Sequence, residues 1–108
     1  QYRLLDGRGG FDTATVTVTV NNVNDAPSGS NGLITITETP NTTPVGHTFV
    51  LADFGFSDSL DSPANAFSLV RITTLATAGV IQLNSVPVTV GQEVSAADIT
   101  SGLLKFIP

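Results

Sequence analysis

The stretch Val20-Asn21-Asn22-Val23-Asn24-Asp25-Ala26-Pro27 divides the chain into two parts of different character. Before it, residues 13–20 alternate threonine with small apolar residues, and after it comes the polar run 28–32. Asn22, Asn24 and Asp25 carry amide or carboxylate oxygens, the type of ligand that calcium takes. Pro27 fixes its own φ and disfavours a helical conformation at the residue before it. The stretch is therefore expected to be an extended linker, either a plain polar loop or one that holds a cation.

Composition bounds the class of protein. The chain has 108 residues, nine acids against four bases, and a formal net charge of −5. This balance lacks the basic patch that nucleic-acid binding needs. The absence of cysteine excludes disulfides, thiolate zinc sites and a cysteine nucleophile. No apolar run reaches the roughly 20 residues of a membrane helix, so no membrane span is predicted in this segment.

The first twenty residues predict a β-hairpin. Residues 2–5 form a short strand, residues 6–10 (Asp-Gly-Arg-Gly-Gly) form a turn, and residues 11–20 form the longest strand. Side chains alternate between the faces of a strand. One face of the long strand therefore carries an apolar row of four residues, Ala14, Val16, Val18 and Val20.

The remainder of the chain predicts further short strands and one helical turn. Strands are expected at residues 33–39, 45–51, 67–75, 80–83, 86–90 and 103–107. Pro87 favours an edge position because proline cannot donate to a ladder. Ser95 is a candidate N-cap for a helical turn over residues 95–99, which Gly102 would end. Phe54 and Phe56 lie two residues apart, so they share a face and are expected to anchor the core.

A second group of oxygen ligands lies in the predicted loop 57–66. Asp58, Asp61 and Asn65 gather there, and Asp6 in the hairpin turn could join a linker site. Calcium takes about six to eight oxygens, so neither the linker group nor the loop group suffices alone. Backbone carbonyls, water or a neighbouring copy would have to supply the rest. The same loop is equally compatible with simple solvation.

Catalytic patterns are not apparent. His47 is the only histidine, and it has neither a second histidine for a metal pair nor a cysteine to activate. It is expected to be a surface or half-buried strand residue. The glycines of residues 7–10 do not follow a strand and open a helix, so they do not predict a phosphate-binding loop. The chain is therefore not expected to be an enzyme.

The linker resembles the junction between cadherin-like repeats, which reads Asp-x-Asn-Asp-x-x-Pro in its usual form. Here Asn22 stands at the position of the first aspartate, and Pro27 comes one residue early. This variant is similar to the Val-Asn-Asp-Ala-Pro junction of very large bacterial surface proteins. The turn over residues 5–10 likewise resembles the Ser-Asp-Gly-x-Gly-Gly turn of such repeats. The resemblance implies linker calcium, although the family's Leu-Asp-Arg-Glu and Asp-x-Asp motifs are not found here.

Residues 54–108 resemble the chondroitin-sulfate-proteoglycan-type repeat, a relative of cadherin repeats. The resemblance is carried by five segments, residues 56–58, 70–75, 79–84, 91–99 and 102–106. It implies an all-β fold, an immunoglobulin-like or cadherin-like β-sandwich used in tandem arrays. In such repeats two further strands follow the segment ending at Phe106.

These patterns predict a chain whose frame is shifted relative to one repeat. Residues 1–20 would be the C-terminal hairpin of a preceding repeat, 21–32 the inter-repeat linker, and 33–108 an incomplete β-sandwich repeat cut from a longer polypeptide. The hairpin could fold back onto its own sandwich or complete a neighbouring copy. The linker resemblance favours the neighbouring copy. The row from Ala14 to Val20 is then expected not to be buried against Phe54, Phe56 and Ile72 of the same chain.

Two functions remain open at this point. The favoured one is a structural repeat of a long extracellular or cell-surface bacterial protein (an adhesin, stalk or filament), with neighbouring copies as partners and possible calcium. The alternative is a carbohydrate- or ligand-binding β-sandwich appended to a secreted enzyme. Sugars stack on exposed aromatic rings, and this chain has no Trp, one Tyr and six Phe. Tandem repetition in the parent chain would favour the first function, and a catalytic neighbour the second.

Overall fold

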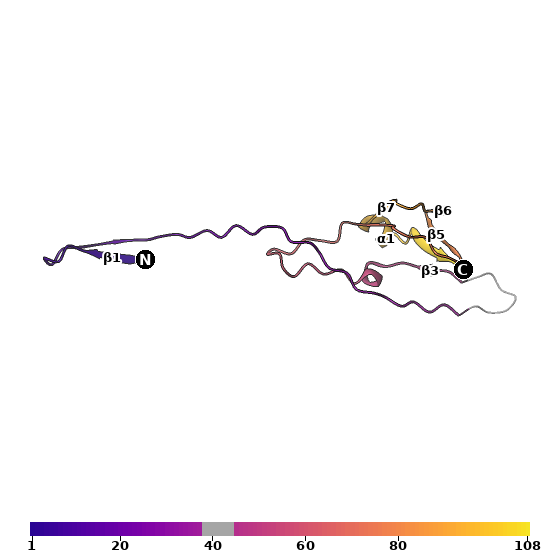
Figure 1. Ribbon diagram of the computed structural model, residues 1–108, viewed down its shortest axis with the longest axis horizontal. Coiled ribbons are helices and arrows are strands. Elements are labelled where there is room, and N and C mark those ends of the chain that lie inside the picture. The colour runs from indigo at the N-terminus through magenta and orange to yellow at the C-terminus, as the bar shows by residue number, and fades with distance from the viewer. Residues whose placement is uncertain (38–44) are drawn as a thin grey trace.

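A computed structural model describes residues 1–37 and 45–108. The molecule measures 96 × 25 × 23 Å, and its radius of gyration is 25.7 Å. A compact domain of this length has a radius of gyration of about 13 Å. Figure 1 shows the reason: the N-terminal residues form a long arm that leaves a small folded body at the other end. We call residues 1–20 the arm, residues 21–32 the linker and residues 45–108 the body.

The arm contains the predicted hairpin, but with a shorter second strand. β1 (Tyr2–Leu5) pairs antiparallel with β2 (Phe11–Ala14), and Tyr2 lies opposite Ala14 at the end of the register. Gly7 and Gly9 have φ of 74° and 97°, as the turn prediction required. Beyond Ala14 the chain continues extended (Figure 1), and residues 15–20 pair with no other described residue. The expected strand to Val20 is thus wrong in its extent, because its second half has no partner.

The main sheet of the body has four strands in the order β3-β8-β5-β6. The bounds are β3 (His47–Thr48), β5 (Val80–Leu83), β6 (Val86–Pro87) and β8 (Leu104–Ile107), and the pairs are antiparallel. Asn84 and Ser85 turn β5 into β6 with φ of 48° and 66°. A two-residue turn with two positive φ values matches the twist of a hairpin. β6 lies at the sheet edge, as Pro87 predicted.

A second, two-stranded sheet pairs β4 (Leu69–Arg71) with β7 (Glu93–Ser95). β7 was not expected from the sequence. It leads directly into α1 (Ala96–Thr100), the predicted helical turn. The Ser95 hydroxyl accepts a hydrogen bond from the Asp98 N–H at 3.0 Å and donates one to the Asp98 carboxylate at 2.7 Å. In the described part of the chain no helix is long and apolar enough to cross a membrane.

The expected strand over residues 45–51 is reduced to β3 and followed by a 3-10 helix, η1 (Leu51–Phe54). The Asp53 carboxylate accepts a hydrogen bond from the Val50 N–H at 2.9 Å, which caps the first turn. Gly55 ends the turn with a φ of 53°. Residues 33–37 are in no strand, and the rest of the strand predicted over residues 33–39 lies outside the described residues.

The core is small. Four apolar side chains are buried, namely Val88, Val94, Ile99 and Leu104. None of the six phenylalanines is buried, although Phe is among the residues most often found inside proteins. Phe54 and Phe56 are half-buried. Phe54 packs against the buried cluster, whereas Phe56 is not among the residues that do so, and the expectation that both anchor the core is wrong for Phe56. The chain is therefore all-β in character, with several small antiparallel sheets around an open core.

Candidate functional site

The linker and the loop 57–66 meet through Asp61. Its Oδ1 accepts hydrogen bonds from the Asn22 side-chain amide at 2.9 Å and from the Asp25 backbone N–H at 3.0 Å. Its Oδ2 accepts one from the Asn65 side-chain amide at 2.7 Å. One carboxylate thus joins residues that lie 36 and 39 positions apart in the sequence. The two groups of oxygen ligands that the sequence presented separately form one cluster.

Asn65 extends this cluster to the remaining members. Its side-chain amide donates to the Asn24 Oδ1 at 2.8 Å, and its backbone N–H donates to the Asp58 Oδ2 at 2.6 Å. We call the whole set the polar junction. Its members are Asn22, Asn24, Asp25, Asp58, Asp61 and Asn65. Sequence reasoning found all six but did not bring them together, because the signal in each group was only a local density of Asn and Asp.

Two carboxylates of the junction are withdrawn from solvent. Asp58 and Asp61 are each 7% exposed, and they are the buried polar residues of the described chain. Every oxygen of Asp61 accepts a hydrogen bond, but the Asp58 Oδ1 is buried and has no partner among the described residues. Burying a charged oxygen without a partner is costly. Within the described residues, the Asp58 Oδ1 is therefore the carboxylate oxygen of the junction whose burial no hydrogen bond offsets.

Backbone contacts hold the linker beside the loop. Ser28 and Ser57 exchange two backbone hydrogen bonds of 2.8 Å each, an isolated antiparallel bridge. The linker then passes so close to Gly55 that a β-carbon there would collide with Ser30. Because Gly55 also has a positive φ, any other residue at that position would be strained as well. These contacts set the direction in which the linker leaves the body.

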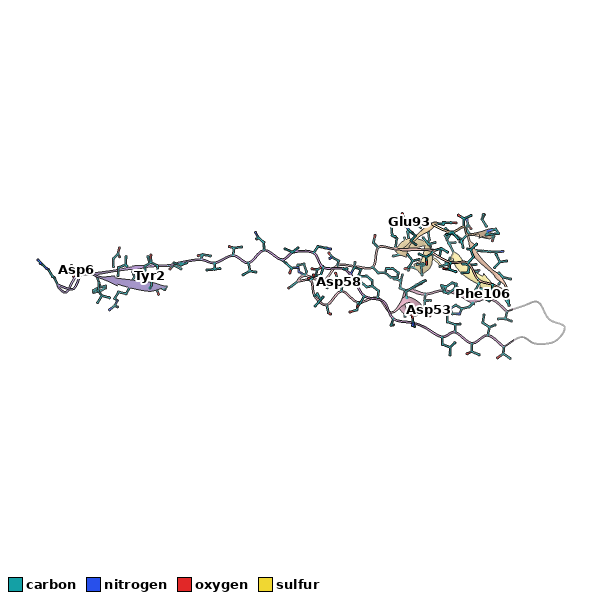
Figure 2. All side chains as sticks on the ribbon, viewed as in Figure 1. Tyr2, Asp6, Asp53, Asp58, Glu93 and Phe106 are labelled. Carbon is teal, nitrogen blue, oxygen red and sulfur yellow. The ribbon has the colours of Figure 1, made fainter. Side chains whose placement is uncertain are left out.

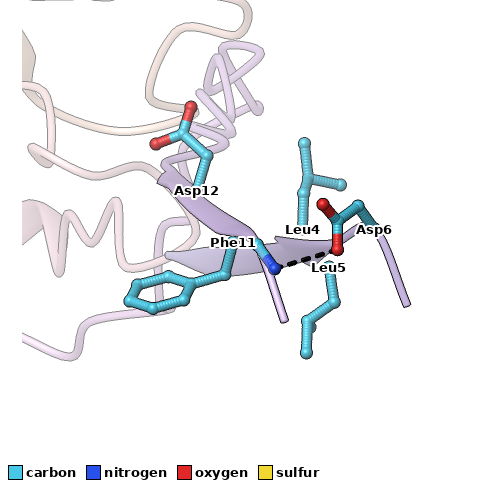
Figure 3. A pocket seen from close by; sticks show the side chains of 6 residues that line it. Leu4, Leu5, Asp6, Phe11 and Asp12 are labelled. Carbon is cyan, nitrogen blue, oxygen red and sulfur yellow. Dashed lines mark hydrogen bonds between the residues drawn. The ribbon is translucent and has the colours of Figure 1, made fainter. Parts of the chain in front are cut away.

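Asp6, the remaining candidate ligand, lies at the tip of the arm, far from Asp58 (Figure 2). Its Oδ1 accepts hydrogen bonds from the backbone N–H groups of Arg8 at 2.8 Å and Gly10 at 3.0 Å, the second of which is drawn in Figure 3. The carboxylate therefore stabilises the hairpin turn. Within one chain it does not join the polar junction.

The chemistry of the junction is that of hard oxygen ligands. Among residues 1–37 and 45–108, no three Asp, Glu, His or Cys side chains converge on a metal-binding position. Any cation held here would be bound by a mixture of carboxylates and amides. Asp58 and Asp61 offer four carboxylate oxygens, and Asn22, Asn24 and Asn65 offer three amide oxygens. Carboxylate and amide oxygens are the ligand type that calcium takes.

His47 lies in a different part of the body. Its Nε2 is 2.9 Å from the Asp53 Oδ2, and its ring contacts Phe49 edge-on, with ring centroids 5.1 Å apart. The pKa of Asp53 is lowered, chiefly by the hydrogen bond from the Val50 N–H and then by the hydrogen bond to His47. The prediction of a half-buried strand residue is confirmed for His47.

An apolar groove begins where the junction ends. Two adjoining hollows of about 280 and 220 Å³ share Pro27, Phe56 and Phe67 in their walls. Phe56 and Phe67 stack at a centroid distance of 5.2 Å, and Phe67 lies 5.7 Å from the Phe54 ring. We call this surface the groove and define it by its apolar lining, Pro27, Phe54, Phe56, Phe67, Leu69 and Val70. The junction residues Asn24, Asp25, Asp58 and Asn65 form its polar end.

Comparison of the chain with protein-family models, with curated proteins and with solved structures found no match.

Proposed function

We propose that this chain is a structural repeat module of a long extracellular bacterial protein, in which cadherin-like β-sandwich units follow one another head to tail. One observation carries the proposal: the polar junction fixes the linker against the body at the point where the arm departs. A free polar linker would let the arm take any direction. Here Asp61 and Asn65 hold three linker residues through side-chain and backbone hydrogen bonds. Such a joint transmits orientation from one unit to the next.

Calcium is the ligand that the junction fits best. The Asp58 Oδ1 is available without breaking any hydrogen bond. The amide groups of Asn22 and Asn65 turn their NH₂ toward Asp61, and a half-turn of an amide exchanges its nitrogen for its oxygen. The same side chains can therefore bridge the carboxylates directly or present oxygens to a cation between them. A bound cation would stiffen the linker by linking both sides of the junction.

The alternative, a sugar-binding sandwich, finds less support in the distribution of aromatic rings. Tyr2 and Phe11 are the two most exposed aromatic side chains, at 44% and 63%. In the β1–β2 register Tyr2 lies opposite Ala14 and Phe11 lies opposite Leu5. Tyr2 and Phe11 therefore point to opposite faces of the hairpin, so they do not form a shared platform for a sugar ring.

Thermal unfolding of the full chain with excess calcium or with a chelator tests the calcium proposal. A ligand that binds only the folded state stabilises it by about 2.7 kcal/mol at a concentration 100 times its Kd. We expect calcium to raise the Tm of the wild type by several degrees. Asp58→Asn should lose this rise, and in chelator it should melt at or above the wild type, because it removes an unpaired buried charge. Asp12→Asn, an exposed change in the arm, is the control.

The opposite pattern would contradict the proposal. An unchanged wild-type melting curve in calcium would show that calcium does not stabilise the folded chain. A calcium response of full size in Asp58→Asn would place the cation elsewhere in the chain.

A further inference from the structure

The arm presents an apolar row whose valines no part of the described chain covers. Val16, Val18 and Val20 are 65%, 79% and 87% exposed. The expectation that this row is not buried against the core of the same chain is confirmed by these values. Tyr2 and Leu4 continue the same face of the hairpin and are 44% and 58% exposed. The backbone of residues 15–20 is also unpaired within the described chain. Both the apolar side chains and the backbone hydrogen-bonding groups of this segment therefore remain available.

The body has an exposed apolar surface, the groove, that could receive such a row. The groove exposes aromatic and aliphatic surface that a complete core would bury, and it runs along β4. Its lining includes Phe67, Leu69 and Val70, in or next to β4, and no residue of β7. β4 pairs only with β7 among the described strands. The edge of β4 away from β7 therefore carries backbone donors and acceptors that no described strand pairs, which is the usual template for an added strand.

The arm of the same chain does not occupy this groove. The junction holds the linker at the polar end of the groove, and the bridge between Ser28 and Ser57 holds it along the second hollow, whose wall includes Ser28 and Gly29. From there the arm runs away from the body, so that Tyr2 and Asp6 lie at the far end of the molecule from Phe106 and Glu93 (Figure 2). Filling the groove in cis would require the chain to reverse and to give up the hydrogen bonds of the junction.

Charge also singles out the arm as the element that can approach a second copy. Arg3 and Arg8 offset Asp6 and Asp12, so residues 1–20 have no formal net side-chain charge. The formal charge of −5 therefore belongs to residues 21–108. Two bodies repel each other, whereas an arm and a body do not. An arm from a second copy can thus enter the groove without an electrostatic penalty.

We propose that the groove receives the arm of a second copy of this chain, which adds a strand to the free edge of β4. Val16, Val18 and Val20 lie about 7 Å apart along a strand and would pack onto Phe56, Phe67 and Leu69. The inference rests on the proposed function and names its contact surface. Each receiving copy keeps its own arm free, so the assembly is heterologous and grows without closing.

Self-association of the full chain tests the proposal, with mass measured by sedimentation over a wide concentration range. The wild type should grow beyond the 11.1 kDa of one chain as concentration rises. Val18→Asp should weaken association at least tenfold. Thr17→Asp is its matched control, because it places the same charge on the opposite face of the same strand. Leu69→Asp should weaken association likewise, whereas Leu75→Asp should not. Leu69 and Leu75 are equally exposed, at 44%.

Mixing the two weakened variants gives the decisive measurement. A Val18→Asp copy retains an intact groove, and a Leu69→Asp copy retains an intact arm. Each should be monomeric alone, and an equimolar mixture should form a species of two chains that grows no further. Complementation of this kind cannot arise from a loss of folding in either variant.

The inference would be overturned by a wild type that stays monomeric throughout, by growth that persists in Val18→Asp, or by a mixture that does not complement. Growth that depends on Val18 but not on Leu69 would also overturn it, since it would indicate edge-to-edge pairing of arms. The calcium response of Val18→Asp separates this failure from that of the proposed function. Val18 is not part of the polar junction, so the melting shift should persist in that variant whatever its association.

Discussion

The arm and the body both contain hydrogen-bonded β-strands, yet only the body has a core. β1 and β8 have four residues each. Leu4 lies in β1 and Leu104 lies in β8. Leu4 is 58% exposed and Leu104 is 1% exposed. β1 has one partner, reached by a tight turn, whereas β8 lies between β3 and β5. The comparison teaches that a hairpin satisfies its backbone locally, but burial requires strands brought together from distant parts of the chain.

The largest expected effect uses this pair of leucines. Leu104→Ala should destabilise the body by about 2–5 kcal/mol, the usual range for a buried leucine. The same change at Leu4 should cost roughly 0.5 kcal/mol or less, as for an exposed position. Urea unfolding of both variants, followed by the far-ultraviolet signal, measures the difference.

Both leucine variants should be made in the Val18→Asp background, in which the protein stays monomeric. Association would otherwise add to the measured free energy of unfolding. Equal costs for the two leucine variants would contradict the division into a cored body and an uncored arm.

A smaller effect is expected at the joint between the two regions. Asp61→Asn removes the charge from a carboxylate that accepts three hydrogen bonds and leaves one amide NH₂ facing other donors. We expect a loss of about 1–3 kcal/mol, as for buried hydrogen-bonded groups. We also expect the arm to lose its fixed direction. X-ray scattering of Asp61→Asn in the monomeric Val18→Asp background should then indicate a broad distribution of radii of gyration. The form with a fixed arm has a radius of gyration of 25.7 Å.

Asp12→Asn is the matched control for Asp61→Asn, because it makes the same change at an exposed position in the arm. An unchanged scattering profile in Asp61→Asn would show that the bridge between Ser28 and Ser57 alone directs the arm. In that case the junction would not act as the joint.

The smallest expected effect concerns pH and lies within the body. The pKa of Asp53 is lowered in the folded state by the Val50 N–H and by His47. A carboxyl group with a lowered folded pKa stabilises the protein above its unfolded pKa of about 4 and loses this contribution as the pH falls through the folded pKa. The melting temperature of Asp53→Asn should therefore lie below that of the wild type at neutral pH, and the two should converge in acid.

The difference between these two melting curves isolates Asp53 from the other carboxylates, which titrate in both proteins. A gap that stays constant between neutral and acidic pH would contradict the assignment.

Short sequence patterns were sufficient to predict the arm turn, the cap of α1 and the edge strand. The Asp-Gly start at Asp6 indicated the arm turn, Ser95 indicated the start of α1, and Pro87 indicated an edge strand; all three are confirmed. These features depend on residues within a few positions of one another, so their patterns are visible in the sequence. β7 and η1 were missed, because each depends on a partner or a cap that alternation of side chains does not reveal.

Strand lengths were beyond the reach of pattern alone. The alternation of residues 13–20 is as regular as any in the chain, yet only residues 11–14 pair. Alternation states which side chains share a face, whereas pairing needs a second strand at the right distance. The same limit applies to Phe54 and Phe56, whose spacing predicted a shared core but whose burial depends on what covers them.

The sequence by itself determined the chemistry of this protein: hard oxygen ligands in two places, an apolar row on one strand face, and a hairpin closed by Asp6. Only the tertiary structure decided that the linker and the loop share one junction around Asp61, and that the row and the groove lie apart in one chain. The physical reason is that ligand type and side-chain alternation are properties of neighbouring residues. Convergence and burial are instead set by contacts between residues tens of positions apart, for which a single sequence carries no local signal.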